Sequence, residues 1–432
     1  MNHYNLYKFT SVFLILLAIS SYFFGFYFDE NSAGAGHYQG DIVNVWKNLQ
    51  IFLTNDIISS IQNQEYYSSR TPLVYIFHEI FNPFTKDIES FRKSVFVISL
   101  TLPILFYFCL RQKFVERDNI LLLLISATVF LSPYFRTSAF WGLEENFGLI
   151  FLLLSFLFLN SFLKNENHKG YKVHFLLFLL IFSSSCCIYF DQKLTIIPAI
   201  CFFKIIKSDK LIKFKLLSFF YYFLFSLPYI YLIILWGGLI PTSLVAGRKL
   251  GSEIFLVHIG YSTTIIAFYL LPLLFFKNKS ILNILKDSFS DKKNYFLVGV
   301  FTIYIFYLIG FFDLGEQSVL GKGIVHKISL ILFDENFFRT TFVYFSFFIS
   351  WIIILLYIEF KFIETICIAY FFMLSAFSWP IHQEYFDPLI LLMAFTFFGT
   401  KIYLSYRNSI ALFIYLLIFF TSTNIYYSNL LD

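Results

Sequence analysis

Charged residues are scarce in this chain. Asp, Glu, Lys and Arg make up only 14% of its 432 residues, whereas 58% are hydrophobic and 23% are aromatic. The mean hydropathy is +0.72. A soluble domain carries far more charge than this. The composition therefore excludes a soluble globular protein and predicts an all-α, polytopic membrane protein whose long apolar helices cross the bilayer.

Cysteine is also rare, and no metal-binding or redox spacing occurs among the five cysteines. All of them fall in apolar runs, which favours an interpretation as small buried side chains. A Gly-rich loop ending in Lys and Ser or Thr, which would hold a nucleotide phosphate, is missing as well. The sequence therefore predicts no cofactor and no nucleic-acid partner, and a divalent metal stays open among the many carboxylates although no ligand spacing supports one. The five are Cys109, Cys186, Cys187, Cys201 and Cys367.

The apolar runs predict about thirteen membrane spans in a single integral domain, residues 1–432. The first run is too long for the apolar core of a signal peptide and lacks a convincing cleavage site, so we expect a mature helix there. No internal repeat or soluble domain interrupts the series. The predicted spans lie near 8–28, 91–110, 119–135, 146–163, 173–190, 194–206, 216–236, 254–276, 295–312, 337–358, 362–380, 387–404 and 408–427.

Basic residues divide unequally between the two sides of this predicted bundle. With the amino terminus inside, 20 of the 32 Lys and Arg residues lie in inside segments, whereas 19 of the 27 acids lie outside. This bias fits the positive-inside rule and predicts the orientation of the spans. We expect the membrane to be a bacterial inner membrane, with the active site on its periplasmic face. The longest outer segment, 29–90, contains two stretches that predict amphipathic surface helices, Ile42–Thr54 and Leu73–Phe81.

Two adjacent carboxylates, Asp29 and Glu30, come directly after the first predicted span and before a small, Gly-rich turn. A charge at the centre of a span costs roughly 2.5–3.5 kcal/mol and less near the interface, so these acids are either interfacial charges or working groups. The glycines allow close approach of a ligand to the backbone. Asp41, beyond the glycines, is either a helix N-cap or a second carboxylate facing the first. All three are candidate catalytic residues, with a carboxylate as general base.

The remaining outer segments each carry a small polar cluster at a membrane boundary. Singly, these clusters also fit ordinary charges, such as a solvated arginine or acids at a helix N-terminus. Jointly they surround one face of a membrane bundle, where Arg suits bidentate recognition of a phosphate. We therefore expect the polar site to bind a substrate phosphate on the outer face. The candidate substrate-binding residues are Arg70, Arg136, Glu144, Glu145, Lys193, Arg248, His382, Gln383 and Glu384.

This combination of features resembles the GT-C superfamily of membrane glycosyltransferases. Asp29-Glu30 matches the acidic motif that follows the first span in that family. Trp236-Gly237-Gly238 with Arg248, and the stretch 383–388, are similar to segments of the branch that includes the α-1,2-glucosyltransferase of lipid-linked oligosaccharide assembly. The late segment departs from that pattern, because the branch more often has Arg where this chain has Gln383 or Glu384.

The resemblance implies inverting transfer of a sugar from a polyprenyl-phosphate donor to a lipid-linked glycan or other cell-envelope acceptor. It implies that Asp29 is the general base and that the reaction takes place on the periplasmic face. It covers the whole chain in topology, but only short motifs in sequence.

Two other classes of protein remain open at this point. A transporter or lipid-linked glycan flippase would place charges in the middle of spans and often shows inverted repeats, whereas the charges here gather at span ends. An O-antigen polymerase or ligase would also be polytopic, but we would expect arginine-rich outer loops, and the outer segments here are acidic overall.

Overall fold

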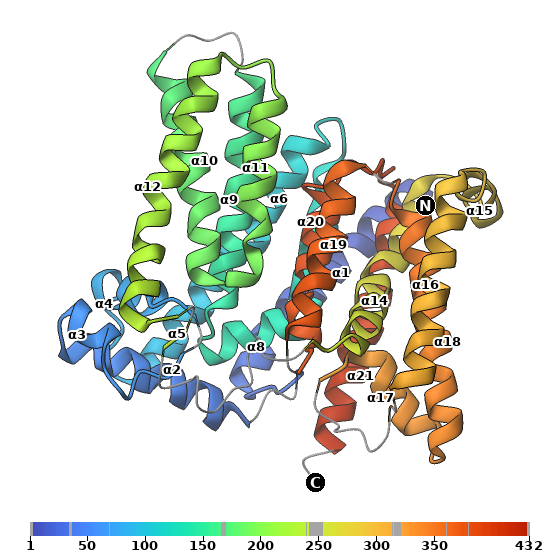
Figure 1. Ribbon diagram of the computed structural model, residues 1–432, viewed down its shortest axis with the longest axis horizontal. Helices are drawn as coiled ribbons and strands as arrows, with labels where there is room; N and C mark the ends of the chain where they lie inside the picture. Colours follow the sequence, from blue (N-terminus) through green and yellow to red (C-terminus); the bar gives the residue numbers. More distant parts are fainter. Residues whose placement is uncertain are drawn as a thin grey trace. The chain divides into compact units, whose positions relative to one another are not determined.

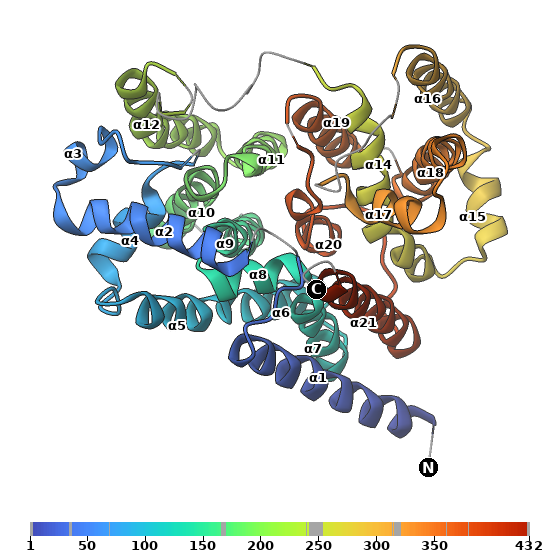
Figure 2. The same ribbon diagram turned by 90° about the horizontal axis from the view of Figure 1, so that it is seen from below.

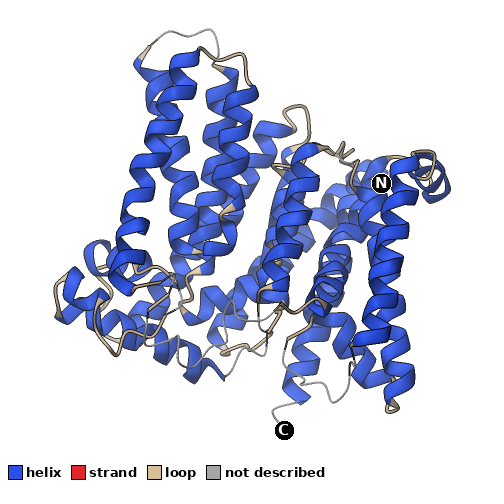
Figure 3. Ribbon diagram, viewed as in Figure 1, coloured by secondary structure: helices blue, strands red, loops and turns tan. Residues whose placement is uncertain are grey.

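The computed structural model describes residues 3–33, 37–68, 70–165, 170–238, 240–241, 254–312, 314, 321–359, 361–378 and 380–429. Helices and loops account for all of the residues in these ranges, and they contain no β-strand (Figure 3). The expectation of an all-α protein is confirmed. The chain divides into two compact units: Met1–Arg248 with Phe413–Asp432, and Lys249–Leu412.

The first unit contains the amino-terminal helices, several of which run side by side (Figure 1). Local capping sets where several of them begin: the side chains of Asp87, Asp118 and Ser132 each accept a hydrogen bond from a backbone N–H in the first turn that follows. Its elements are α1 (His3–Tyr27), α2 (His37–Thr54), α3 (Ile57–Ile61), α4 (Leu73–Phe81), α5 (Ile88–Ser99), α6 (Thr101–Lys113), α7 (Asn119–Ala127), η1 (Thr128–Leu131), α8 (Pro133–Trp141), α9 (Glu145–Lys164), α10 (Tyr171–Phe190), η2 (Gln192–Leu194), α11 (Ile196–Lys207), α12 (Ile212–Trp236) and most of α21 (Tyr406–Asn429).

The second unit is built around α14, which packs against α17, α18, α19 and α20 (Figure 2). Its elements are α14 (Val257–Leu270), η3 (Leu271–Lys277), α15 (Ile281–Ser288), α16 (Lys292–Phe311), α17 (Gly323–Leu332), α18 (Asn336–Tyr357), α19 (Phe362–Ala376), η4 (Gln383–Tyr385) and α20 (Leu389–Phe395).

Within the described ranges, nine helical segments are long and apolar enough to cross a membrane. A tenth is obtained if Asn119–Leu131 and Pro133–Trp141, which are bent by 67° at Ser132, count as one span. The chain is thus an integral, multi-pass membrane protein. The count of thirteen is not confirmed, because the predicted spans 194–206, 362–380 and 387–404 contain only short helices. A straight helical span needs about 20 residues to cross the hydrocarbon core.

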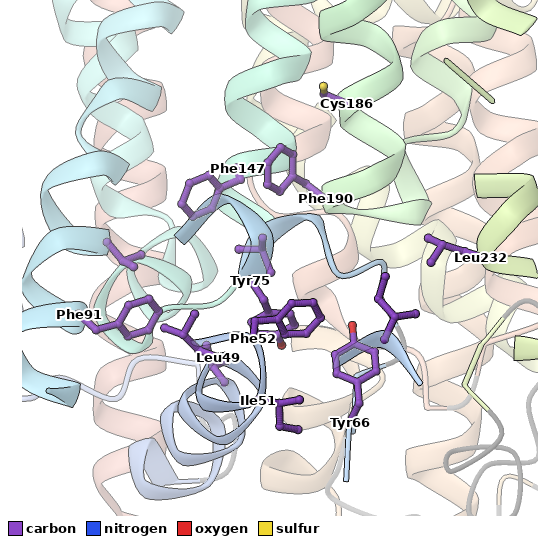
Figure 4. Packing of buried hydrophobic residues seen from close by; sticks show 14 of the residues in the cluster. Leu49, Ile51, Phe52, Tyr66, Tyr75, Phe91, Phe147, Cys186, Phe190 and Leu232 are labelled. Carbon is purple, nitrogen blue, oxygen red and sulfur yellow. The ribbon is translucent and has the colours of Figure 1, made fainter. Parts of the chain in front are cut away.

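The first outer segment does contain the two expected helices. Helix α4 has the predicted bounds, and α2 begins at His37, five residues earlier than expected. Both pack onto the ends of α9, α10 and α12 through one apolar cluster (Figure 4). Phe52 stacks on Tyr75 with ring centroids 5.7 Å apart, and the Trp236 indole N–H donates to the Ile61 carbonyl at 3.3 Å. This cluster holds the outer segment against the helix ends that carry the polar residues.

Cysteine labelling tests the predicted orientation. All five native cysteines are free and buried, so an added cysteine should dominate the signal. Gln64 lies in the first outer segment and is exposed, and Ser280 caps α15 on the predicted inner side. In intact cells, we expect a membrane-impermeant maleimide to label Gln64→Cys but to reach Ser280→Cys only after permeabilisation. Equal labelling of both variants in intact cells would contradict the orientation.

Candidate functional site

Asp29 lies at an unusual point of the backbone. After α1 ends, the Glu30 N–H donates to the Gly25 carbonyl at 2.9 Å, which closes the last turn as in a Schellman motif. In such a motif the residue before the donor adopts the left-handed conformation and is usually glycine. Here it is Asp29, with a φ of 53°. The sequence thus places a carboxylate, about half exposed, where glycine would be less strained.

Arg92 of α5 holds Asp29 in place. Its Nη2 atom donates to Asp29 Oδ1 at 2.6 Å, and its Nε atom donates to the Phe140 carbonyl at 2.8 Å. The Arg92 side chain is only 7% exposed, and its guanidinium lies over the rings of Phe26 and Trp141, 4.5 and 4.2 Å from their centroids. A guanidinium fixed in this way orients the carboxylate that it binds. The sequence interpretation missed Arg92, although an arginine at the start of an apolar span is an available signal.

Glu30 points to a different partner, Arg136 of α8. The two side chains form a bidentate pair, with Arg136 Nε to Glu30 Oε1 at 2.9 Å and a second contact between Nη2 and Oε2. Arg136 is fully buried, and it also donates to the carbonyls of Ser21 and Phe130, at 2.6 and 3.0 Å. This residue, predicted to contact a substrate phosphate, is therefore engaged by the chain itself.

Gly25 packs directly against the Glu30–Arg136 pair, so adding a methyl group at this position tests how rigidly the pair is held. A Cβ atom there would overlap Arg136 Nη2 and Glu30 Oε2, which the surrounding contacts hold in position. We expect Gly25→Ala to lower the free energy of unfolding by about 1–3 kcal/mol, as overpacking does. The measurement is denaturant unfolding of the purified protein.

Gly299→Ala is the matched control for Gly25→Ala. A Cβ at Gly299, inside α16, meets no atom within 4 Å. Alanine also favours a helix interior over glycine. We expect this variant to be at least as stable as the wild type, and equal stability of the two variants would contradict the packing argument.

A second polar cluster joins the segment before α4 to the start of α9. Arg70 Nη1 lies 3.3 Å from Glu144 Oε2, and its Nη2 atom donates to Glu145 Oε1. Burial raises the pKa of the Glu144 carboxyl, Arg70 opposes this rise and Glu145 adds to it. Burial alone would lower the pKa of Arg70, but the charges of Glu145, Glu144 and Asp191 outweigh it and raise that pKa.

Asp191 and Lys193 complete this cluster at the turn between α10 and α11. Their side chains form an ion pair at 3.0 Å, and both are at least nine-tenths buried. The Asp191 carboxylate also caps η2 by accepting from the Lys193 N–H at 3.2 Å. The charge of Lys193 acts on Glu145 as well. Three carboxylates and two bases therefore share one buried environment with a formal charge of −1, which makes the cluster better suited to a hydroxyl-bearing or cationic group than to a phosphate.

Helix α8 connects the two clusters. Arg136 lies on one turn of it, the Phe140 carbonyl binds Arg92, and Ser138 Oγ donates to Glu145 Oε2 at 3.4 Å. Every residue of the helix except Tyr134 is buried. This short element therefore contributes contacts to both clusters, and in the chain it lies between η1 and α9.

The structure establishes no contact between the other predicted site residues and these two clusters. Asp41 is within α2, which starts at His37, so it does not cap that helix. His382, Gln383 and Glu384 belong to the second unit. Arg248 and the turn residues 34–36, which include Gly34 and Gly36, lie outside the described residues. Among the residues that the structure describes, no three His, Cys, Asp or Glu side chains are arranged to hold a metal ion.

These features define an integral, multi-pass helical membrane protein with a charged cluster at the end of its first span. No family model, no curated protein and no solved structure matches the chain.

Proposed function

We propose that this chain is a membrane glycosyltransferase that moves a sugar from a polyprenyl-phosphate donor to a lipid-linked glycan or other cell-envelope acceptor on the non-cytoplasmic face. The observation that carries the proposal is Asp29. This carboxylate is half exposed at the end of a membrane span, in a strained backbone conformation, and a buried arginine binds it. Strain of this kind gathers at functional sites, where the surrounding structure maintains it.

Asp29 acts as the general base in this mechanism. Arg92 binds Oδ1 of Asp29, and Oδ2 accepts the proton of the acceptor hydroxyl. The hydroxyl oxygen forms a bond to the anomeric carbon while the bond from that carbon to the phosphate oxygen breaks, with inversion at the carbon. The polyprenyl phosphate leaves with the electron pair, and Asp29 then releases its proton to water.

Arg92 and Glu30 have supporting roles in this proposal. Arg92 keeps the Asp29 carboxylate in one orientation, which is the kind of positioning that catalysis by proton transfer requires. Glu30 neutralises the buried Arg136 and thereby ties the end of α1 to α8. The Arg70 cluster, with its surplus carboxylate, contributes acceptors for hydroxyl groups of a sugar.

The direct test is transfer by the purified protein in detergent. A panel of polyprenyl-phosphate hexoses is offered with lipid-linked glycans extracted from membranes, and the products are the elongated glycan and free polyprenyl phosphate. The alternative classes predict different results: a flippase moves its lipid with the sugar–phosphate bond intact, and a polymerase releases polyprenyl diphosphate. Absence of polyprenyl phosphate release across the panel, with the protein shown to be folded, would contradict the proposal.

A further inference from the structure

His78 lies on the face of α4 that packs against the first unit. Its side chain is 1% exposed. The imidazole ring meets the rings of Phe91 of α5 and Phe147 of α9 nearly at right angles, with centroids 4.9 and 5.3 Å away. Both phenylalanines belong to the apolar cluster that holds the outer segment (Figure 4). A titratable group therefore lies inside the interface between α4 and the helices on which it packs.

The hydrogen bonds of Asn82 determine where the neutral ring carries its proton. The Phe84 N–H donates to Asn82 Oδ1 at 3.0 Å, so the other amide atom, Nδ2, is the one that faces His78 Nδ1 at 2.9 Å. Because Nδ2 can only donate, Nδ1 must accept, and the proton of the neutral imidazole lies on Nε2. The same Nδ2 atom donates to Ser94 Oγ at 2.8 Å, which ties the end of α4 to α5.

The second proton of an imidazolium is poorly accommodated at this site. It would bind Nδ1, where it would face the amide donor of Asn82 in place of an acceptor. Nε2 has no hydrogen-bond partner among the residues that the structure describes. Burial, which is the only cause, lowers the pKa of His78 to about 3. The packed interface therefore requires the neutral ring.

The charged side chains of the surrounding elements do not compensate a charge on His78, because they are exposed to solvent or bound elsewhere. Arg92 of α5 binds Asp29, and Glu145 of α9 is bound by Arg70. On α4, on α5 and in the turn between them, the exposed charged residues are Glu79, Lys86, Asp87, Glu89 and Lys93. Protonation of His78 would thus place an uncompensated charge in the interface.

Departure of α4 from this interface would expose the ring to water and return its pKa to the ordinary value near 6.5. Between that value and about 3, the undocked form binds a proton that the docked form does not. Docking of α4 is therefore fully stable above this window and weakens as the pH falls through it. Within the window, each pH unit favours undocking by about tenfold.

We propose that His78 is an acid-sensitive switch: its neutral ring keeps α4 docked, and protonation releases this helix together with Arg70, which lies just before it. Arg70 binds Glu144 and Glu145, so its release opens the polar cluster at the start of α9. On the outer face, where we expect this segment, the surrounding pH acts on the ring directly. The proposal does not depend on the sugar transfer proposed above, because the opening of α4 is measured without turnover.

Hydrogen–deuterium exchange of the full chain, purified in an uncharged maltoside detergent, measures this opening. The exchange rate of the peptide 73–82 is divided by its intrinsic rate at each pH, which gives the opening constant even when the open form is rare. For the wild type we expect this constant to rise by roughly 30-fold between about pH 7.5 and pH 5.0. His78→Asn keeps an acceptor for the Asn82 amide but does not titrate, so we expect its opening constant to change by less than about threefold.

His174→Asn is the matched control. His174 lies near the start of α10 and contacts Phe214, with ring centroids 5.0 Å apart, so this variant should keep the wild-type pH dependence. Asn82→Asp gives an independent test, because its carboxylate would accept from a protonated Nδ1. We expect the opening constant of that variant no longer to rise as the pH falls.

A wild-type opening constant that does not change with pH, or an equal rise in His78→Asn, overturns the proposal. If His78→Asn does not fold, Asn82→Asp decides the question alone, and an undiminished rise in that variant overturns the proposal.

Discussion

Replacing Asp29 with asparagine is expected to lower the rate of sugar transfer by roughly 10²–10⁴-fold, the usual contribution of a positioned general base. Asparagine keeps the size of the side chain and one oxygen for Arg92, but its amide cannot accept the proton of the acceptor hydroxyl. Asparagine also tolerates the left-handed conformation that residue 29 adopts. The variant should fold, but with reduced stability because the buried Arg92 loses its closest carboxylate, so activity is compared per folded molecule.

Turnover is measured as release of polyprenyl phosphate per folded molecule. Glu89→Gln is the matched control, because it also removes a carboxylate that pairs with Arg92. Glu89 is 60% exposed, and its carboxylate lies 3.9 Å from Arg92 Nη1. We expect near-wild-type turnover for Glu89→Gln and a smaller loss for Glu30→Gln than for Asp29→Asn. Near-wild-type turnover for Asp29→Asn would transfer the role of base to Asp41 or Glu144. Near-wild-type turnover for Asp29→Asn, Glu30→Gln and Asp41→Asn alike would end the interpretation of these acids as the catalytic centre.

The helices were predictable because their signals are local. Apolar runs and amphipathic spacing predicted α4 with its bounds and α2 to within five residues at its start. The number of spans was less predictable, because composition does not reveal where a helix bends. Ser132 ends one helix and caps the next, so the run 119–135 divides into two pieces bent by 67°.

The charged site was predictable only in part. The boundary of the first span identified Asp29 and Glu30, but their partners lie 63 and 106 residues away, and only tertiary packing brings them together. For the same reason Arg70 and Arg136, predicted to contact a substrate, bind carboxylates of the chain.

Removing one member of the Glu30–Arg136 pair should destabilise the first unit strongly. We expect Arg136→Met and Glu30→Met each to cost about 3–5 kcal/mol of unfolding free energy, because each leaves its partner charged and buried without compensation. The measurement is denaturant unfolding of the purified protein. Lys279→Met, which breaks an exposed pair with Asp287, is the control and should leave the unfolding midpoint nearly unchanged.

The double variant distinguishes loss of the ion pair from loss of packing. With both charges gone, no buried charge remains unpaired, and two methionines fill a similar volume. The Phe130 carbonyl still loses its donor, Arg136 Nη1, so some cost persists. We therefore expect Glu30→Met with Arg136→Met to be more stable than either single variant. If the two single effects simply add, the pair is not energetically coupled, and the role assigned to Glu30 in tying α1 to α8 fails with it.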